Sequence, residues 1–268
     1  YEIPLRLVGS EMCIRDRNEI VELVRNYVHP ETGVIYNVDK LELKTNEGRG
    51  FGKAKFILKE GGTLGDLYTH ADLKRDINGN VLIDDDGNVT AVDNAGDIKL
   101  GSVLPKANLA WNNSFTYKGI NAGFLVTARL GGIVYSATQA YLDLYGVSET
   151  SAAARDAGGV WVNDRSQVNP QSFYSVVASQ SGLPTYYTYS ATNVRLQEAH
   201  IGYTIPRRWL GNVCDINVSL VGRNLWMIYC KAPFDPEAVA TTNNYYQGID
   251  YFMMPSTRNI GFNVKINF

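Results

Sequence analysis

The last ten residues of the chain alternate without a break between apolar and polar or small side chains. Successive side chains of a β-strand point to opposite faces, so this pattern predicts a strand with one wholly apolar face. Ten residues also exceed the usual five or six of a strand in a globular protein. The apolar set is Ile260, Phe262, Val264, Ile266 and Phe268, and the other set is Asn259, Gly261, Asn263, Lys265 and Asn267.

The same alternation recurs upstream and predicts an all-β fold with about six strands. In one segment, Val194–Ile205, the phase slips at Gln197–Glu198, which predicts a β-bulge. The weakest of the set is Gly52–Leu58, where Ala54, Phe56 and Leu58 are in phase. The remaining predicted strands are Asn108–Tyr117, Asn121–Gly131 and Asp215–Asn224.

The connections between these strands alternate between short and long. Lys118-Gly119 forms one tight turn, and Ile205 to Val213 is also short. The other links span about fifty, about sixty and over thirty residues. Outer-membrane barrels combine short periplasmic turns with long extracellular loops, and their strands need about 9–11 residues to cross the bilayer. We therefore predict an antiparallel transmembrane β-barrel with its apolar face toward lipid.

Aromatic residues support this prediction. Tyr (17) outnumbers Phe (9), which suits surfaces that are partly apolar and partly wet. Such side chains form girdles at the edges of membrane barrels. The candidates near strand ends are Trp111, Tyr117, Tyr203, Trp209 and Trp226.

Overall composition excludes several other classes of protein. The net charge is −2, with 45% hydrophobic and 19% charged residues, which argues against a disordered chain and against a basic nucleic-acid-binding surface. No run of about 18 apolar residues predicts a transmembrane helix. These averages also fit a soluble β-sandwich with one wet face, and a soluble all-β carbohydrate-binding module stays open as the alternative.

Several segments together resemble the C-terminal part of SusC/RagA-type TonB-linked outer-membrane transporters. They are Leu100–Tyr117, which contains Leu104-Pro105-Lys106, and Val194–Leu210, which reads VRLQEAHIGYTIPRRWL. The segment Val218–Leu225 contains SLVGRNL and is followed by Phe234-Asp235-Pro236-Glu237. The end of the chain adds Gly248-Ile249-Asp250-Tyr251, Pro255 and the Phe-terminated strand. The order and spacing of these motifs carry the resemblance.

The resemblance implies the C-terminal portion, about six strands, of a 22-stranded barrel that holds a plug. Residues 18–268 would form this portion, whereas residues 1–17 resemble a non-native leader. The implied location is the cell outer membrane, and the implied role is import of oligosaccharides or peptides without enzymatic chemistry. The implied partners are a SusD-like lipoprotein, the TonB complex through an N-terminal part missing from this sequence, and the outer-membrane assembly machinery. That machinery would read Phe268 as the terminal aromatic signal.

The sequence contains no catalytic constellation, so its candidate site residues are binding residues. Aromatic side chains flanked by amides in the long loops suit sugar or peptide ligands or a docked lid, although packing within the loops explains them equally well. These residues are Tyr141, Tyr145, Trp161, Tyr186, Tyr187, Tyr189, Tyr245 and Tyr246. The polar faces of the strands place Arg129, Arg223 and Lys265 toward the barrel lumen.

The stretch Asp76, Asn78, Asn80 and Asp84 is similar to a calcium-binding loop, but the Gly and Glu of an EF-hand are absent from their positions. Solvated turns and a bound Ca²⁺ are therefore both open, and no other cofactor is predicted. The three His residues show no metal-ligand spacing. Cys214 and Cys230 flank one long strand, too far apart for a disulfide, so we predict free thiols.

Overall fold

The computed structural model describes residues 19–20, 23, 27–28, 33, 35–36, 39–43, 53–163, 166–179, 182–209, 211, 213–240 and 247–267. The predicted leader, residues 1–17, lies outside them, as do Cys13, His29, Tyr245, Tyr246 and Phe268. The chain divides into two compact units. The long-sheet unit comprises Pro105–Gly132, Ser190–Ala238 and Met254–Phe268, and the helix-containing unit comprises Tyr1–Leu104, Ile133–Tyr189 and Val239–Met253.

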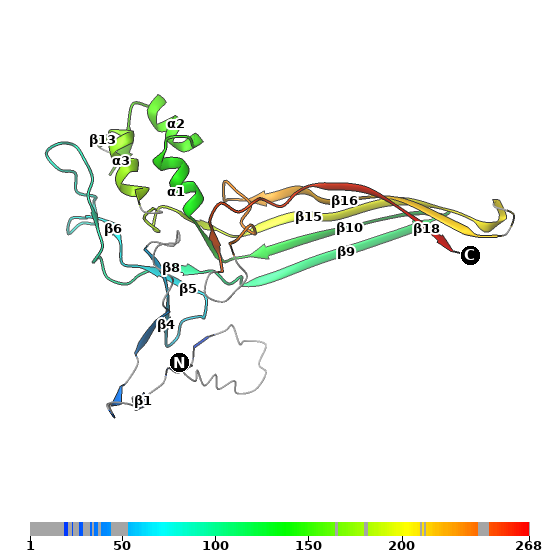
Figure 1. Cartoon of the computed structure of the whole chain (residues 1–268), viewed down its shortest axis with the longest axis horizontal. Helices are drawn as coiled ribbons and strands as arrows, with labels where there is room; N and C mark the ends of the chain where they lie inside the picture. The colour runs from blue at the N-terminus through cyan, green and yellow to red at the C-terminus, as the bar shows by residue number, and fades with distance from the viewer. Residues whose placement is uncertain are drawn as a thin grey trace. The chain divides into compact units, whose positions relative to one another are not determined.

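The long-sheet unit is an open, five-stranded antiparallel sheet in the order β18-β16-β15-β10-β9 (Figure 1). A turn with positive φ at Lys118 (47°) and Gly119 (88°) joins its first two strands, as the right-handed twist of a hairpin requires. A short connection containing the 3₁₀-helix η2 (Arg207–Trp209) joins β15 to β16. The strands are β9 (Ala107–Tyr117), β10 (Ile120–Leu130), β15 (Asn193–Ile205), β16 (Asp215–Cys230) and β18 (Asn259–Asn267).

The bulge predicted from the sequence is confirmed. The register of β15 against both neighbours shifts between Leu196 and Glu198, so Gln197 is the extra residue. Because of this shift, the apolar residues on either side of Gln197 face the same way. Free thiols at Cys214 and Cys230 are also confirmed.

The register aligns apolar residues across all five strands. One row joins Tyr117, Ile120, Tyr203, Val218 and Val264, and the next joins Phe115, Ala122, Ile201, Leu220 and Phe262. Directly paired residues share one face of a sheet, so these rows form a continuous apolar face. Its large side chains are exposed, for example Phe262 at 81% and Leu220 at 54%. We call this surface the apolar face and the opposite surface the polar face.

The helix-containing unit holds the hydrophobic core of the described residues. Its largest fully buried side chains include Tyr135, Phe56, Leu67 and Ile249. They lie on a four-stranded sheet, β3-β4-β5-β8, and on a three-stranded sheet, β14-β11-β17. The strands of these sheets are β3 (Lys40–Leu43), β4 (Ala54–Lys59), β5 (Asp66–Thr69), β8 (Ile98–Ser102), β11 (Ile133–Ser136), β14 (Thr188–Ser190) and β17 (Ile249–Asp250).

Three short helices follow β11, and each begins at a side-chain cap. The N-cap of the first is Ser136, that of the second is Ser148, and the third starts with Asn169 followed by Pro170 at its first turn. The helices are α1 (Ala137–Leu144), α2 (Glu149–Asp156) and α3 (Pro170–Val177). The remaining short strands are β1 (Tyr27–Val28), β2 (Ile35–Tyr36), β6 (Asp72–Leu73), β7 (Ala91–Val92), β12 (Val160–Val162) and β13 (Ser166–Val168). None of the helices that the structure describes is long and apolar enough to span a membrane.

Two sequence predictions need correction. Gly52–Leu58 contains a strand, but β4 pairs with β3 and β5 rather than joining the long sheet. The reason is burial on both faces: Phe56 and Leu58 are buried on one face of the strand, and Ile57 is buried on the other. The fold is also mostly β rather than all-β, because the long segment between β10 and β15 contains three helices as well as short strands.

A charged cluster stabilises the four-stranded sheet and makes its stability depend on pH. The Asp97 carboxylate accepts hydrogen bonds from Lys59 Nζ (2.6 Å) and Lys40 Nζ (3.1 Å), and these lysines lower the pKa of Asp97 to about 2. An acid whose pKa is lower in the folded state stabilises the fold above its unfolded-state pKa. That contribution is lost as the pH falls from about 4 through about 2.

We expect Asp97→Asn to destabilise the helix-containing unit at neutral pH, and the deficit relative to wild type to vanish near pH 2. Urea unfolding of the full-length protein, followed at several pH values by protection from protease, measures this difference. Asp93→Asn is the control, because Asp93 pairs with Lys53 but its side chain is 73% exposed. A deficit for Asp97→Asn that stays constant down to pH 2 would contradict the prediction.

Candidate functional site

The polar face of the long sheet presents hydrogen-bonding and charged side chains along its whole length. One row joins Thr116, Asn121, Gly202, Ser219 and Asn263 across the five strands. The predicted lumen residues Arg129, Arg223 and Lys265 all lie on this face, since their strand partners are Asn193, Glu198 and Asn217. The face is therefore suited to contact water or a polar ligand, unlike the surface behind it.

Two glycines allow side chains of the polar face to lie close to the backbone. A Cβ at Gly123 would lie 2.5 Å from Cε1 of His200, and one at Gly202 would lie 2.5 Å from Oδ1 of Asn121. At distances this short, a Cβ at either position would force neighbouring atoms to shift. His200 and Asn121 therefore lie flat against the sheet, and larger residues at the two glycines would displace them.

An exposed ion pair crosses the middle of the polar face. Arg223 Nε lies 3.0 Å from Glu198 Oε2, between neighbouring strands. The side chains are 66% and 36% exposed, so the pair adds little stability and leaves both charges accessible to a solute.

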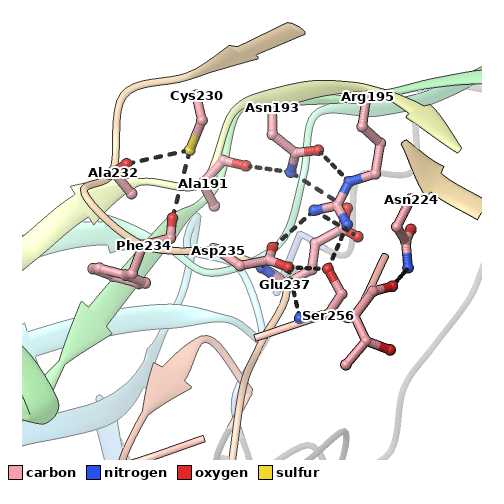
Figure 2. Close-up of polar contacts among 11 residues, drawn as sticks. Ala191, Asn193, Arg195, Asn224, Cys230, Ala232, Phe234, Asp235, Glu237 and Ser256 are labelled. Carbon is pink, nitrogen blue, oxygen red and sulfur yellow. Dashed lines mark hydrogen bonds and ion pairs between the residues drawn. The ribbon is translucent and has the colours of Figure 1, made fainter. Parts of the chain in front are cut away.

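A buried cluster lies at the start of β15 and the end of β16, where β16 leads into the long connection to β18 (Figure 2). Its centre is Arg195, whose side chain is 5% exposed. Arg195 Nη2 lies 2.8 Å from Asp235 Oδ1 and 3.2 Å from Glu237 Oε2. Both acids belong to the Asp235-Pro236-Glu237 motif, so one arginine on a strand anchors this connecting loop.

Further hydrogen bonds complete the cluster. Asn193 Nδ2 donates to Glu237 Oε1 at 3.3 Å, and the hydroxyl of Ser256 donates to Asp235 (Figure 2). Burial alone would raise the pKa of Asp235, but hydrogen bonds from Ser256, the Glu237 N–H and Arg195 outweigh it and hold this pKa below its usual value. The loop is therefore attached on both sides, at residues 235–237 and at residue 256.

Sequence reasoning quoted both motifs of this cluster but assigned them no role. Arg195 is part of the VRLQEAH segment, and the DPE motif lies forty residues further on. The only local signal in the sequence was an arginine among the polar residues of a strand. Arg223 gives the same signal but is exposed, so the signal does not distinguish a buried arginine from an exposed one. A cavity of about 430 Å³ lies beside the cluster, between Trp226, Phe234 and Arg258.

The predicted loop aromatics that the structure describes do not form one surface. Tyr145 (74%) and Trp161 (61%) are exposed, whereas Tyr187 is 2% exposed and contributes to the core. Tyr141 instead packs against Phe252, with ring centroids 5.5 Å apart. Tyr186 packs against Phe173 at 6.2 Å, and Tyr189 is half-buried.

Asp143 brings some of these tyrosines together, although sequence reasoning did not select it. Asp143 is 6% exposed, and its Oδ1 accepts hydrogen bonds from Gln139 and Thr150. Burial and the nearby Asp143 charge raise the pKa of Tyr187 and of Tyr174, and they raise that of Tyr189 to about 12. A buried carboxylate surrounded by phenols is thus the polar centre of the helical region.

The Asp76 stretch forms turns. Asp76 Oδ1 accepts the backbone N–H groups of Asn78 and Asn80, both at 2.8 Å, and Asp84 Oδ1 accepts that of Asn88 at 2.7 Å. Asp side chains commonly cap turns in this way. Among the residues that the structure describes, no group of three or more His, Cys, Asp or Glu is placed to hold a metal ion. The hydrogen bonds of Asp76 and Asp84 are those of turns.

The sequence is similar to that of one kind of known receptor. No family model matches the sequence. TonB-dependent receptor P3 of Formosa agariphila is 24% identical over 254 residues, an alignment that covers 85% of this chain and 24% of that receptor. The chain thus spans about a quarter of the length of the curated relative that it matches.

The chain is therefore similar to part of a TonB-dependent receptor, and receptors of that class are outer-membrane transporters rather than enzymes. Among solved structures it resembles part of the RagAB peptide transporter, with a TM-score of 0.55, 16% identity and coverage of 88% of this chain and 25% of that one. The RagAB peptide importer in its closed-closed state gives a TM-score of 0.51, 15% identity and coverage of 85% and 28%. At these identities the likeness shows the fold alone.

Proposed function

We propose that the chain forms the C-terminal wall and extracellular loops of a TonB-dependent transporter that imports oligosaccharides or peptides. In this proposal the long sheet belongs to a closed 22-stranded barrel in the outer membrane, and residues 18–268 are its final part. A SusD-like lipoprotein covers the extracellular mouth, and the TonB complex acts through the N-terminal part of the full-length receptor.

The observation that carries the proposal is the continuous apolar face of the long sheet. It extends over strands of 9 to 16 residues, long enough to cross a bilayer with tilt. Phe262, Ile260 and Ile201 are exposed by 81%, 70% and 57%. A contiguous apolar surface of this extent is unfavourable in water and favourable against lipid.

The polar face then lines the lumen, with Arg129, Arg223 and Lys265 on the solute pathway. The buried Arg195 cluster fixes the connection between the last two strands at the extracellular end, because the short turns occupy the opposite, periplasmic end. Loop aromatics that are exposed, such as Tyr145 and Trp161, are available to a substrate or to the lid. Phe268 would serve as the assembly signal.

The alternative, a soluble all-β carbohydrate-binding module, is less well supported. A soluble sandwich packs the apolar face of one sheet against a second sheet. In the described part of the chain the apolar face carries no such cover, because the core of the helix-containing unit is made of other residues.

Deletion of the full-length gene from the bacterium that carries it tests the proposal. We expect the deletion strain to lose growth on one class of nutrient, within a panel of polysaccharides and peptide mixtures supplied as the sole carbon source. We also expect the receptor to fractionate with the outer membrane and to show a heat-modifiable band, as folded barrels do. Recovery of the full-length receptor in the soluble fraction, together with unchanged growth on the whole panel, would refute the proposal.

A further inference from the structure

A small cavity between the three helices is lined by an exposed arginine, Arg155, that has no partner among the described residues. The cavity, of about 250 Å³, is lined by the end of α1, by α2 and by the start of α3. Among the described residues, no hydrogen bond or ion pair engages the Arg155 side chain, whereas Lys53 and Lys55, which line another cavity, are paired. An unpaired guanidinium in a concave site is a ready donor for a carboxylate, which it can hold with two parallel hydrogen bonds.

The position of Arg155 follows from the loop that joins α1 to α2. Gly146 has a φ of +69°, and a Cβ there would lie 2.9 Å from Nη1 of Arg155. The missing side chain thus lets the guanidinium lie against the loop backbone, at the edge of the cavity. Arg155 also stands in the last turn of α2, where its charge interacts favourably with the helix C-terminus.

Polar and aromatic side chains share the rest of the cavity wall with Leu144 and Pro170. Asp143 lines it and is 6% exposed, and its Oδ1 accepts hydrogen bonds from Gln139 and Thr150, so the cavity wall includes a buried anionic group. Tyr145, 74% exposed, offers an aromatic face, and Gln171 and Tyr174 offer an amide and a hydroxyl. The cavity thus has a cationic donor at one place and a buried anionic acceptor at another.

We propose that this cavity binds a ligand unit that carries a carboxylate and, a few atoms away, an O–H or N–H donor. Arg155 holds the carboxylate, Asp143 accepts from the donor, and the Tyr145 ring packs against the apolar side of the unit. Two sources share this chemistry: a uronic acid of an oligosaccharide and the C-terminal residue of a peptide. The inference rests on the proposed function, because it makes the helices of the loop region a substrate-capture site of the transporter.

Titration of the full-length receptor in detergent with four probes tests the inference. The probes are glucuronate and its methyl ester, and N-acetylalanine and its methylamide, with binding followed by saturation-transfer NMR and calorimetry. We expect one or both carboxylates to bind and their neutral partners to bind at least about tenfold more weakly. Binding of glucuronate alone identifies a uronic acid, binding of N-acetylalanine alone identifies a peptide terminus, and binding of both identifies the carboxylate as sufficient.

Substitutions locate the binding. Arg155→Ala should lower the affinity for the probe that binds by about ten- to a hundredfold, as expected for the loss of a charge-assisted hydrogen bond. Arg155→Lys should restore part of the affinity. Arg208→Ala is the matched control, since Arg208 is an exposed arginine in a short helix of the other unit. The inference is wrong if neither carboxylate probe binds the wild-type receptor. It is also wrong if the Arg155→Ala receptor binds the probe as tightly as the wild type does.

Failure of the inference differs from failure of the proposed function. If the receptor fractionates with the outer membrane and supports growth but binds neither carboxylate, the proposed function stands and the inference is refuted. A receptor recovered in the soluble fraction loses the function, while the probe titration still reports whether Arg155 binds carboxylates.

Discussion

Phe262→Arg should abolish assembly of the full-length receptor in the outer membrane. Phe262 lies in the middle of β18, beside Leu220, and is 81% exposed on the apolar face. If that face meets lipid, an arginine near the middle of the bilayer costs about 2–4 kcal/mol. Outer-membrane fractions should then show loss of the heat-modifiable band.

Asn263→Arg is the matched control for this substitution. Asn263 is the next residue of the same strand and points to the polar face, opposite Ser219. If the polar face lines a watery lumen, the same charge there should leave assembly close to wild type. If both substitutions abolish assembly, the assignment of the two faces is wrong. If neither substitution affects assembly, a soluble sheet is favoured.

Arg195→Ala should release the loop between β16 and β18. The substitution leaves the carboxylates of Asp235 and Glu237 without their cation, and Asp235 is only 8% exposed. Removal of one partner of a buried ion pair lowers the free energy of unfolding by about 3–5 kcal/mol, because the remaining charge stays desolvated. We expect faster proteolysis within residues 231–258 and a lower midpoint of urea unfolding in the full-length receptor.

Two further variants give this prediction its controls. Arg223→Ala removes an arginine whose pair with Glu198 is exposed, which should cost only about 0–1 kcal/mol. The double variant Arg195→Met, Asp235→Leu replaces the pair by apolar residues and should recover part of the loss. If Arg195→Ala is as mild as Arg223→Ala, the cluster does not anchor the loop.

The strands of the long sheet were the most predictable part of the fold, because alternation acts over ten residues and depends on no distant partner. The bulge at Gln197 was visible for the same reason, since a slip in phase is itself a local pattern. Alternation did not identify the sheet to which Gly52–Leu58 belongs, because alternate apolar residues also occur in a strand that is buried on both faces. Only the pairing of β4 with β3 and β5 reveals which sheet it joins.

The sites were less predictable than the strands. A tyrosine-rich loop indicated aromatic surfaces, but burial separates Tyr187, in the core, from Tyr145, in solvent. Asp143 and Arg155 were not selected, because nothing local distinguishes them from other charged residues on short helices. Their role depends on α1, α2 and α3 packing around one cavity. The caps Ser148 and Asn169-Pro170 could have revealed the two missed helices.

The separation of the buried core from the apolar face implies that one polypeptide has two solvent requirements. The helix-containing unit excludes water with its own side chains, whereas the long sheet, under the proposed function, depends on lipid or detergent to do so. Amphiphile withdrawal should therefore precipitate the protein through the sheet while the helices stay folded, and mild denaturants should act in the opposite order. Any purification of the receptor has to satisfy both parts at once.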